Sequence, residues 1–182
     1  MISAMTILAA IGDIQRFPTS SKLVGYSGLG ARVRSSGQTH RGGGITKQGR
    51  RELRTAMITV AWAAVRNNPR WREQFRRLER RVGTLKAIVA IARKLLVVVW
   101  HVLTARTADR HSVPEAVARS FFTWATEHRL ATSMGMSRVQ FVRRELGRIG
   151  IEEEVTRFTY SGRTYDLSAA HDHTVCNSPV TA

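Results

Sequence analysis

The sequence predicts a mainly α-helical protein that carries a basic serine-containing loop and, near its end, a β-hairpin. Three observations predict this fold class. Apolar residues recur at helical spacing between residues 46 and 105. Residues 31–45 are rich in glycine and lack that period, which indicates a loop or a short extended excursion. Residues 155–167 alternate on either side of Ser161-Gly162, which is typical of a hairpin.

Residues 1–105 are predicted to form one domain, which begins with a short apolar helix over residues 2–11. Three longer helices are expected over about residues 47–67, 71–82 and 84–105. Thr46 is the expected cap of the first of them, and Gly83 is expected to end the second. Because the junctions between the three helices are short, they are expected to pack as an antiparallel unit.

The helix over residues 84–105 contains the most apolar stretch of the chain. Three basic residues interrupt this stretch, so a buried helix is predicted and not a membrane span: Lys86, Arg93 and Lys94. It is expected to contact the helix over residues 47–67 through Leu95, Val99 and Leu103.

Residues 106–167 are predicted to form a helical extension that ends in the hairpin. The spacing Ser112-x-x-Glu115 is that of a capping box and predicts a helix to about His128. The spacing Ser137-x-x-Gln140 predicts a second helix, which Gly150 closes. Residues 168–182 have little to bury and are expected to form a disordered tail.

The net charge of +16 on 182 residues indicates a polyanionic partner, with nucleic acid as the leading class and an anionic membrane surface as its rival. The charge is concentrated in residues 31–54, where seven basic residues and one acid, Glu52, give a net +6. The seven predicted nucleic-acid-binding residues are Arg32, Arg34, Arg41, Lys47, Arg50, Arg51 and Arg54. The glycines at 42–44 lack the ending of a P-loop, but they open onto an expected helix start near Thr46, which favours a phosphate.

Two serines, Ser35 and Ser36, lie where the positive charge is densest. A serine hydroxyl attacks phosphorus when a base or metal removes its proton and cations stabilise the developing charge. The nearby arginines can supply the cations, and His40 is the one neutral base in the segment. The alternatives are that both serines are turn residues, or that Tyr26 is the nucleophile, although Tyr26 is expected to pack.

No metal site is predicted in this chain. A metal nuclease needs several carboxylates around one or two ions, whereas residues 1–72 contain only Asp13 and Glu52. Glu152, Glu153 and Glu154 are consecutive, so their side chains are expected to diverge.

Four sequence elements occur in a fixed order: IGDI…RFP at residues 11–18, YSGL at 26–29, SSG at 35–37 and ITKQGRRELR at 45–54. In this order they resemble the C-terminal transposase domain of the DEDD-type insertion-sequence transposases related to the Piv and MooV DNA invertases. The better-studied members of that family are bridge-RNA-guided recombinases. The resemblance extends to about residue 105, and residues 106–167 resemble an extension found in some members.

The resemblance implies a function in DNA transposition by serine-mediated strand cleavage and rejoining. It implies that Ser36, or alternatively Ser35, is the nucleophile, and that the basic residues contact phosphates of DNA or of a guide RNA. In this family a separate N-terminal RuvC-like domain holds divalent metal, expected to be magnesium, on an Asp-Glu-Asp-Asp set. Nothing in this sequence matches that domain, so the chain is expected to be a truncated copy, a mis-called start or half of a split gene.

Whether the chain is an enzyme is therefore left open, and alone it is expected to be inactive. The expected partners are DNA, a guide RNA, and further copies of the chain or a full-length transposase, with no membrane. The expected location is the nucleoid in the cytoplasm of a prokaryote. The alternative is a non-catalytic nucleic-acid-binding relic that modulates a full-length transposase.

Overall fold

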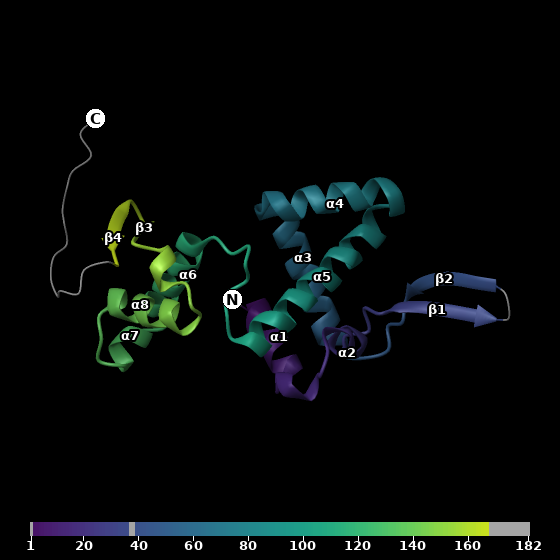
Figure 1. The fold of residues 1–182 in the computed structure, drawn as a ribbon, viewed down its shortest axis with the longest axis horizontal. Helices are drawn as coiled ribbons and strands as arrows, with labels where there is room; N and C mark the ends of the chain where they lie inside the picture. The colour runs from purple at the N-terminus through teal and green to yellow at the C-terminus, as the bar shows by residue number, and fades with distance from the viewer. Residues whose placement is uncertain (1, 37–38, 168–182) are drawn as a thin grey trace. The chain divides into compact units, whose positions relative to one another are not determined.

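The computed structural model describes residues 2–36 and 39–167 (Figure 1). The chain divides into two compact units, Met1–Ala105 and Arg106–Ala182, and each is described by itself. The expected disordered tail at 168–182 lies outside the described residues. The described part is mainly α-helical, as predicted.

The first unit begins with three short helical elements: α1 (Ile2–Ile11), the 3₁₀ turn η1 (Ile14–Arg16) and α2 (Ser20–Tyr26). Side chains of the preceding residues begin the last two elements. A carboxylate oxygen of Asp13 accepts a hydrogen bond from the Gln15 amide at 2.9 Å, and the Thr19 hydroxyl accepts one from the Lys22 amide at 3.4 Å. Each satisfies a backbone donor that has no partner inside the helical turn.

The three longer helices are α3 (Arg51–Asn67), α4 (Pro69–Val82) and α5 (Thr84–Ala105). They form the three-helix unit that was predicted, with α5 packed against both α3 and α4 (Figure 1). Asn68 separates the first two, and its side-chain oxygen accepts a hydrogen bond from the Arg70 amide at 3.0 Å. Gly83, at φ 80°, ends α4 in a conformation that favours glycine.

The core of the first unit lies between α3 and α5. Leu53, Met57 and Ala61 of α3 are fully buried there. The fully buried stripe of α5 comprises Ala87, Ile91, Ala92 and Leu96, with Ile88 almost fully buried beside them. Leu95, Val99 and Leu103, which were expected to make this contact, are only half-buried at the edge of the same core. The difference arises because α5 also packs against α2 and α4, which places the centre of its buried face at Leu96.

By length and composition alone, α5 could cross a membrane, which is weak support for such a role. In this chain its apolar stripe instead packs against α2, α3 and α4.

Residues 31–45, expected as a loop or short extended excursion, form an antiparallel hairpin of β1 (Ala31–Ser36) and β2 (Thr39–Ile45), here called the serine hairpin. The sequence does not show it as a strand pair, because three consecutive glycines in β2 interrupt the alternation that identifies strands. The register shifts near its base: Ala31 pairs with Ile45, and Val33 pairs with Gly42. Thus β2 has one residue more than β1 between these pairs, which is a β-bulge.

Thr46 does not cap α3, contrary to the prediction. The helix begins at Arg51, with Arg50 at the N-cap position and no side-chain cap. Lys47 and Gly49 have φ values of 56° and 131°, which a right-handed helix cannot contain. Thr46 instead donates a hydroxyl hydrogen bond to the Gly28 carbonyl at 3.3 Å.

The second unit contains α6 (Pro114–Glu127), α7 (Leu130–Ser133), α8 (Arg138–Arg148), the turn η2 (Glu152–Glu154), and the hairpin of β3 (Arg157–Tyr160) and β4 (Arg163–Asp166). The hairpin turns at Ser161-Gly162, as predicted. Its aromatic residues pack on Phe122 of α6, with ring-centroid distances of 5.4 Å to Phe158 and 4.5 Å to Tyr165. This aromatic contact fixes the hairpin to the helical part of the unit.

One of the two predicted capping boxes is present. The Ser137 hydroxyl accepts a hydrogen bond from the Gln140 amide at 3.2 Å, and the Gln140 side chain accepts one from the Ser137 amide at 2.8 Å. The box predicted at Ser112 is absent, because α6 has Val113 as its N-cap and Pro114 as its first residue. Ser112 therefore lies one position too early to cap the helix.

Candidate nucleic-acid interface

The register of the serine hairpin places its predicted site residues in two sets. Arg34 is paired with Arg41, Ser35 with His40, and Ser36 with Thr39. Paired residues share a face of a ribbon, and residues two apart along a strand share that face as well. Position 36 therefore shares a face with positions 34 and 41, whereas position 35 belongs to the opposite face, with His40.

The base of the hairpin is held by the hairpin root, which we define as residues 26–30 and 46–50. Three backbone amides of the second segment donate to carbonyls of the first: Thr46 to Gly30 at 2.9 Å, Lys47 to Gly28 at 3.1 Å and Arg50 to Tyr26 at 2.8 Å. These bonds continue the pairing of the strands inward as far as the end of α2. The hairpin is thus joined to α2 and α3 through backbone hydrogen bonds as well as through the covalent chain.

Two glycines make this close approach possible. A Cβ atom at Gly49 would lie 2.2 Å from the Tyr26 carbonyl oxygen, and one at Gly28 would lie 2.8 Å from the Gln48 carbonyl oxygen. Both glycines also have positive φ values, 131° and 69°. The spacing of glycine in YSGL and ITKQG is therefore explained by packing at the root.

Arg54 stabilises the root from α3. It is half-buried, and its guanidinium donates hydrogen bonds to the carbonyls of Ser27 at 3.2 Å and Lys47 at 3.3 Å. Ser27, the one fully buried polar residue among those described, donates its hydroxyl to the Val24 carbonyl at 2.7 Å and accepts from the Leu29 amide at 3.2 Å. Arg54 therefore makes structural hydrogen bonds within the protein, which join α3 to the root.

Tyr26 and two arginines form a cluster at the root. Tyr26 is half-buried, and its ring lies against Phe17 with centroids 5.1 Å apart, so the packing expected from the sequence is present. The guanidinium of Arg16 lies 4.9 Å from the Tyr26 ring centroid. A hydrogen bond from the Arg50 side chain, with the nearby charges of Arg50 and Arg16, lowers the pKa of the Tyr26 phenol below its usual 10.0.

The remaining basic residues of the prediction differ in exposure and partners. Arg32, Lys47 and Arg51 are exposed, and no carboxylate of the described residues forms an ion pair with them. Arg50 lies 3.7 Å from a carboxylate oxygen of Glu52. The structure thus brings four of the seven basic residues to the root or its edge: Lys47, Arg50, Arg51 and Arg54.

Helix α4 carries a second basic surface, which is not among the residues predicted from the sequence. This helix contains six arginines and two glutamates. Arg72 donates to the Val65 carbonyl at 3.3 Å, Arg77 pairs with Glu73, and Glu79 accepts from the Thr84 hydroxyl at 2.7 Å. Three exposed arginines form no ion pair with any described carboxylate, and we call them the α4 arginine face: Arg76, Arg80 and Arg81. The net +4 of residues 69–82 was the signal available in the sequence.

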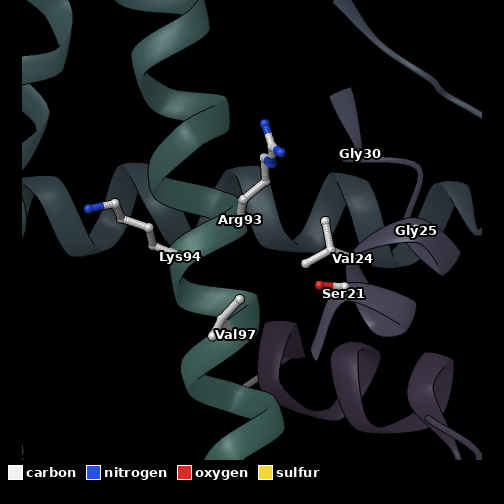
Figure 2. A pocket seen from close by; sticks show the side chains of 7 residues that line it. All are labelled: Ser21, Val24, Gly25, Gly30, Arg93, Lys94 and Val97. Carbon is white, nitrogen blue, oxygen red and sulfur yellow. The ribbon is translucent and has the colours of Figure 1, made fainter. Parts of the chain in front are cut away.

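A shallow hollow of about 390 Å³ lies between α2 and α5, beside the hairpin root (Figure 2). Arg93 projects toward Val24 and Gly30 at this hollow, whereas Lys94 projects to the other side of α5. The Lys94 ammonium donates to the side-chain oxygen of Gln74 on α4 at 3.0 Å. Arg93 therefore adds one further cation near the root.

The described residues contain no group of three or more His, Cys, Asp or Glu side chains placed to hold a metal ion. In the described part of the chain, the carboxylate of Glu52 faces the cluster through Arg50. The donor set of the described residues does not fit a divalent metal.

Comparison with known proteins finds transposases that are similar in sequence to the first part of the chain. The model of the "Transposase IS116/IS110/IS902 family" matches residues 1–76. The chain is 36% identical over 128 residues to "Putative transposase y4qE" of Sinorhizobium fredii, an alignment that covers 69% of this chain and 33% of the relative. It is 33% identical over 113 residues to "Transposase for insertion sequence element IS1111A" of Coxiella burnetii, covering 60% and 31%.

A third relative is the "Insertion element IS110 uncharacterized 43.6 kDa protein" of Streptomyces coelicolor, 30% identical over 116 residues, or 63% of this chain and 29% of the relative. The chain thus spans about a third of the length of the curated relatives it matches. No solved structure matches it. The first 76 residues, which contain the serine hairpin and its root, match the IS116/IS110/IS902 family of transposases.

Proposed function

We propose that this chain is the serine-carrying, DNA-binding part of a transposase that cleaves and rejoins DNA through Ser36. The observation that carries the proposal is the register of the serine hairpin, which gives position 36 the same face as Arg34 and Arg41. The match of residues 1–76 to a transposase family supports DNA as the substrate.

In the proposed reaction the Ser36 hydroxyl oxygen attacks a DNA phosphorus. A bond from phosphorus to serine forms, the bond from phosphorus to one sugar oxygen breaks, and that oxygen leaves as a hydroxyl after taking a proton. Rejoining is the reverse step with a new sugar hydroxyl as the attacking group. The arginines of the hairpin would stabilise negative charge on the phosphate oxygens as it develops.

Removal of the serine proton requires a base. Position 40, the histidine of this segment, pairs with position 35 and not with position 36, and Glu52 faces Arg50. We therefore assign the base to a RuvC-like acidic domain. The resemblance implies that magnesium belongs to that same domain.

The basic surfaces support the nucleic-acid part of the proposal. Arg32, Lys47 and Arg51 around the root and the α4 arginine face are exposed and carry no described counter-charge. Each cation that neutralises a phosphate releases condensed counterions, so binding should weaken steeply with salt. A guide RNA, further copies of this chain and a full-length transposase are the other proposed partners, and the nucleoid in the cytoplasm is the proposed location.

The second candidate function is non-catalytic: a nucleic-acid-binding protein that modulates a full-length transposase by mixed assembly. The observation that favours it is the scarcity of carboxylates among the described residues near the root, where Glu52 faces Arg50 at 3.7 Å.

The experiment that separates the two is a denaturing gel of labelled DNA with the wild-type chain, Ser36→Ala and Ser35→Ala. Each is tested with magnesium, with and without the acidic domain of a relative added as a separate polypeptide. We expect a covalent adduct only when the acidic domain is present, and its loss in Ser36→Ala but not in Ser35→Ala. An adduct that persists in both variants would exclude serine chemistry in this hairpin, and binding without any adduct would favour the non-catalytic function.

A further inference from the structure

The cluster of Arg16, Tyr26 and Arg50 adds polar side chains to a part of the root that backbone hydrogen bonds and ring packing already hold. The Arg50 backbone amide already joins α3 to α2 through the Tyr26 carbonyl at 2.8 Å. The Tyr26 ring is already packed on Phe17. The phenol and the two guanidinium groups are additional to these contacts, and the Arg50 side chain is about half exposed.

We propose that Arg16, Tyr26 and Arg50 bind a phosphodiester of the DNA backbone at the hairpin root, separate from the phosphate attacked by Ser36. The inference rests on the proposed function for its ligand class. It adds a second phosphate-binding site, at the opposite end of the hairpin from the serines.

The chemistry of the three side chains fits a phosphate. The guanidinium groups of Arg16 and Arg50 can each donate two hydrogen bonds to an oxyanion. The neutral Tyr26 phenol can donate an O–H hydrogen bond to the same oxyanion. Arg16 lies over the Phe17 and Tyr26 rings, at 5.0 and 4.9 Å, so its guanidinium is oriented before any ligand arrives. Among the described residues, Glu52 forms the ion pair with the cluster, and its contact with Arg50 at 3.7 Å is solvent-exposed and therefore weak.

The two sites lie at opposite ends of the serine hairpin. At about 3.3 Å per residue, the five steps of β1 from Ala31 to Ser36 span roughly 16–17 Å. The cluster lies outside this strand, at the root. We therefore expect the root to bind a different phosphate from the one that Ser36 attacks.

The test compares the full chain with Tyr26→Phe, Arg50→Gln and the double variant, using a labelled DNA duplex and fluorescence anisotropy at several salt concentrations. Tyr160→Phe, on β3 of the second unit, is the matched control for removal of a phenol hydroxyl. Tyr26→Phe should weaken binding about fivefold, the effect of one hydrogen bond, without changing the salt slope. Arg50→Gln should weaken binding and reduce that slope by about 0.9, because one phosphate is no longer neutralised.

Two readouts distinguish phosphate binding from a purely structural role. The double variant should weaken binding by less than the product of the two single effects, because the two side chains contact the same phosphate. Wild-type binding should also weaken as the pH rises toward 10, since ionised Tyr26 repels phosphate and its pKa is lowered by Arg50 and Arg16. This extra weakening should be absent from Tyr26→Phe and present in Tyr160→Phe.

Wild-type affinity and an unchanged pH profile in Tyr26→Phe would overturn the inference. If a variant melts at a lower temperature than wild type, NMR of labelled tyrosine in the wild-type chain decides. Bound DNA should raise the pKa of Tyr26, and an unchanged pKa would overturn the inference. Failure of the wild-type chain to bind DNA would instead contradict the proposed function, so the two failures are distinguishable.

Discussion

The amide of Arg50 donates a 2.8 Å hydrogen bond to the carbonyl of Tyr26, and this bond determines where α3 begins. Because the Arg50 amide is directed at α2, the helix cannot extend back to Thr46, and its first residue is Arg51. The same bond holds the end of α2, the start of α3 and the base of the serine hairpin together. A change at this junction should therefore affect all three elements at once.

Replacing Gly49 by alanine should destabilise the first unit by several kcal/mol. The new Cβ would lie 2.2 Å from the Tyr26 carbonyl oxygen, and alanine is strained at φ 131°. Gly25→Ala is the matched control, because a Cβ at Gly25 meets nothing within 4 Å and α2 is helical there. Chemical denaturation should show a large decrease in stability for Gly49→Ala and none for Gly25→Ala. Equal stabilities would show that the segments of the root can move apart at Gly49 without a loss of unfolding free energy.

Leu96→Ala should cost about 2–5 kcal/mol of unfolding free energy, because Leu96 is fully buried in the core. Leu95→Ala should cost clearly less, since Leu95 is only half-buried. The two substitutions remove the same atoms from neighbouring positions, so the difference reports burial alone. The reverse order in a urea titration would mean that α5 packs in a different rotation.

Ser137→Ala should destabilise the second unit by about 1 kcal/mol, because it removes both the side-chain cap of α8 and part of a reciprocal pair with Gln140. Ser112→Ala is its control within the same sequence pattern and should change stability by less than about 0.5 kcal/mol, since Ser112 does not cap α6. Thermal unfolding followed by circular dichroism measures both. A similar decrease in the two variants would indicate that Ser112 does cap α6, as the sequence predicted.

Replacing Arg32, Arg34 and Arg41 together by alanine should weaken DNA binding by the isolated chain. On duplex DNA the slope of log affinity against log salt should fall by about 0.9 for each phosphate that these arginines neutralise. Affinity measured across a range of salt concentrations gives this slope directly. An unchanged slope would remove the serine hairpin from the interface with DNA.

Replacing Arg76, Arg80 and Arg81 by glutamine should also reduce the salt slope, because these three exposed cations have no described acidic partner. Glutamine retains the helix propensity of α4, so the helix should persist. The control variant is Arg77→Gln, whose arginine already pairs with Glu73 and should contribute less. If Arg77→Gln alone matched the triple change, the salt slope would not report DNA binding by this face.

The helices could be predicted because the residues that begin and end each helix lie within a few positions of its ends. Asn68-Pro69, Gly83 and Ser137-x-x-Gln140 act within a few residues of each helix end, and the structure has the expected ends at each. Thr46 and Ser112 have side chains that could cap a helix. At both positions, contacts or residues elsewhere make the helix begin at a later residue. Thr46 instead pairs with Gly28, which lies eighteen residues away along the chain, so the sequence around Thr46 does not indicate this contact.

The candidate site was predictable in composition and not in arrangement. The excess of positive charge in residues 31–54 is visible in the sequence, as are the two serines. The separation of positions 35 and 36 onto two faces depends on strand pairing, which the glycines of β2 conceal. The meeting of Arg16 with Tyr26 and Arg50 depends on three elements that fold together, and so it could be found only in the structure.

The β-bulge is a place where β2 can lose a residue without changing which faces the residues beyond it occupy. It lies between the pairs Ala31–Ile45 and Val33–Gly42, where β2 has its extra residue among consecutive glycines. Deletion of Gly44 would make the two strands equal in length there and leave every pair from Val33 to Ser36 intact. Deletion of Arg32 would instead shift β1 by one step and exchange the faces of the two serines. Insertions and deletions should therefore be tolerated on one strand of this ribbon and not on the other.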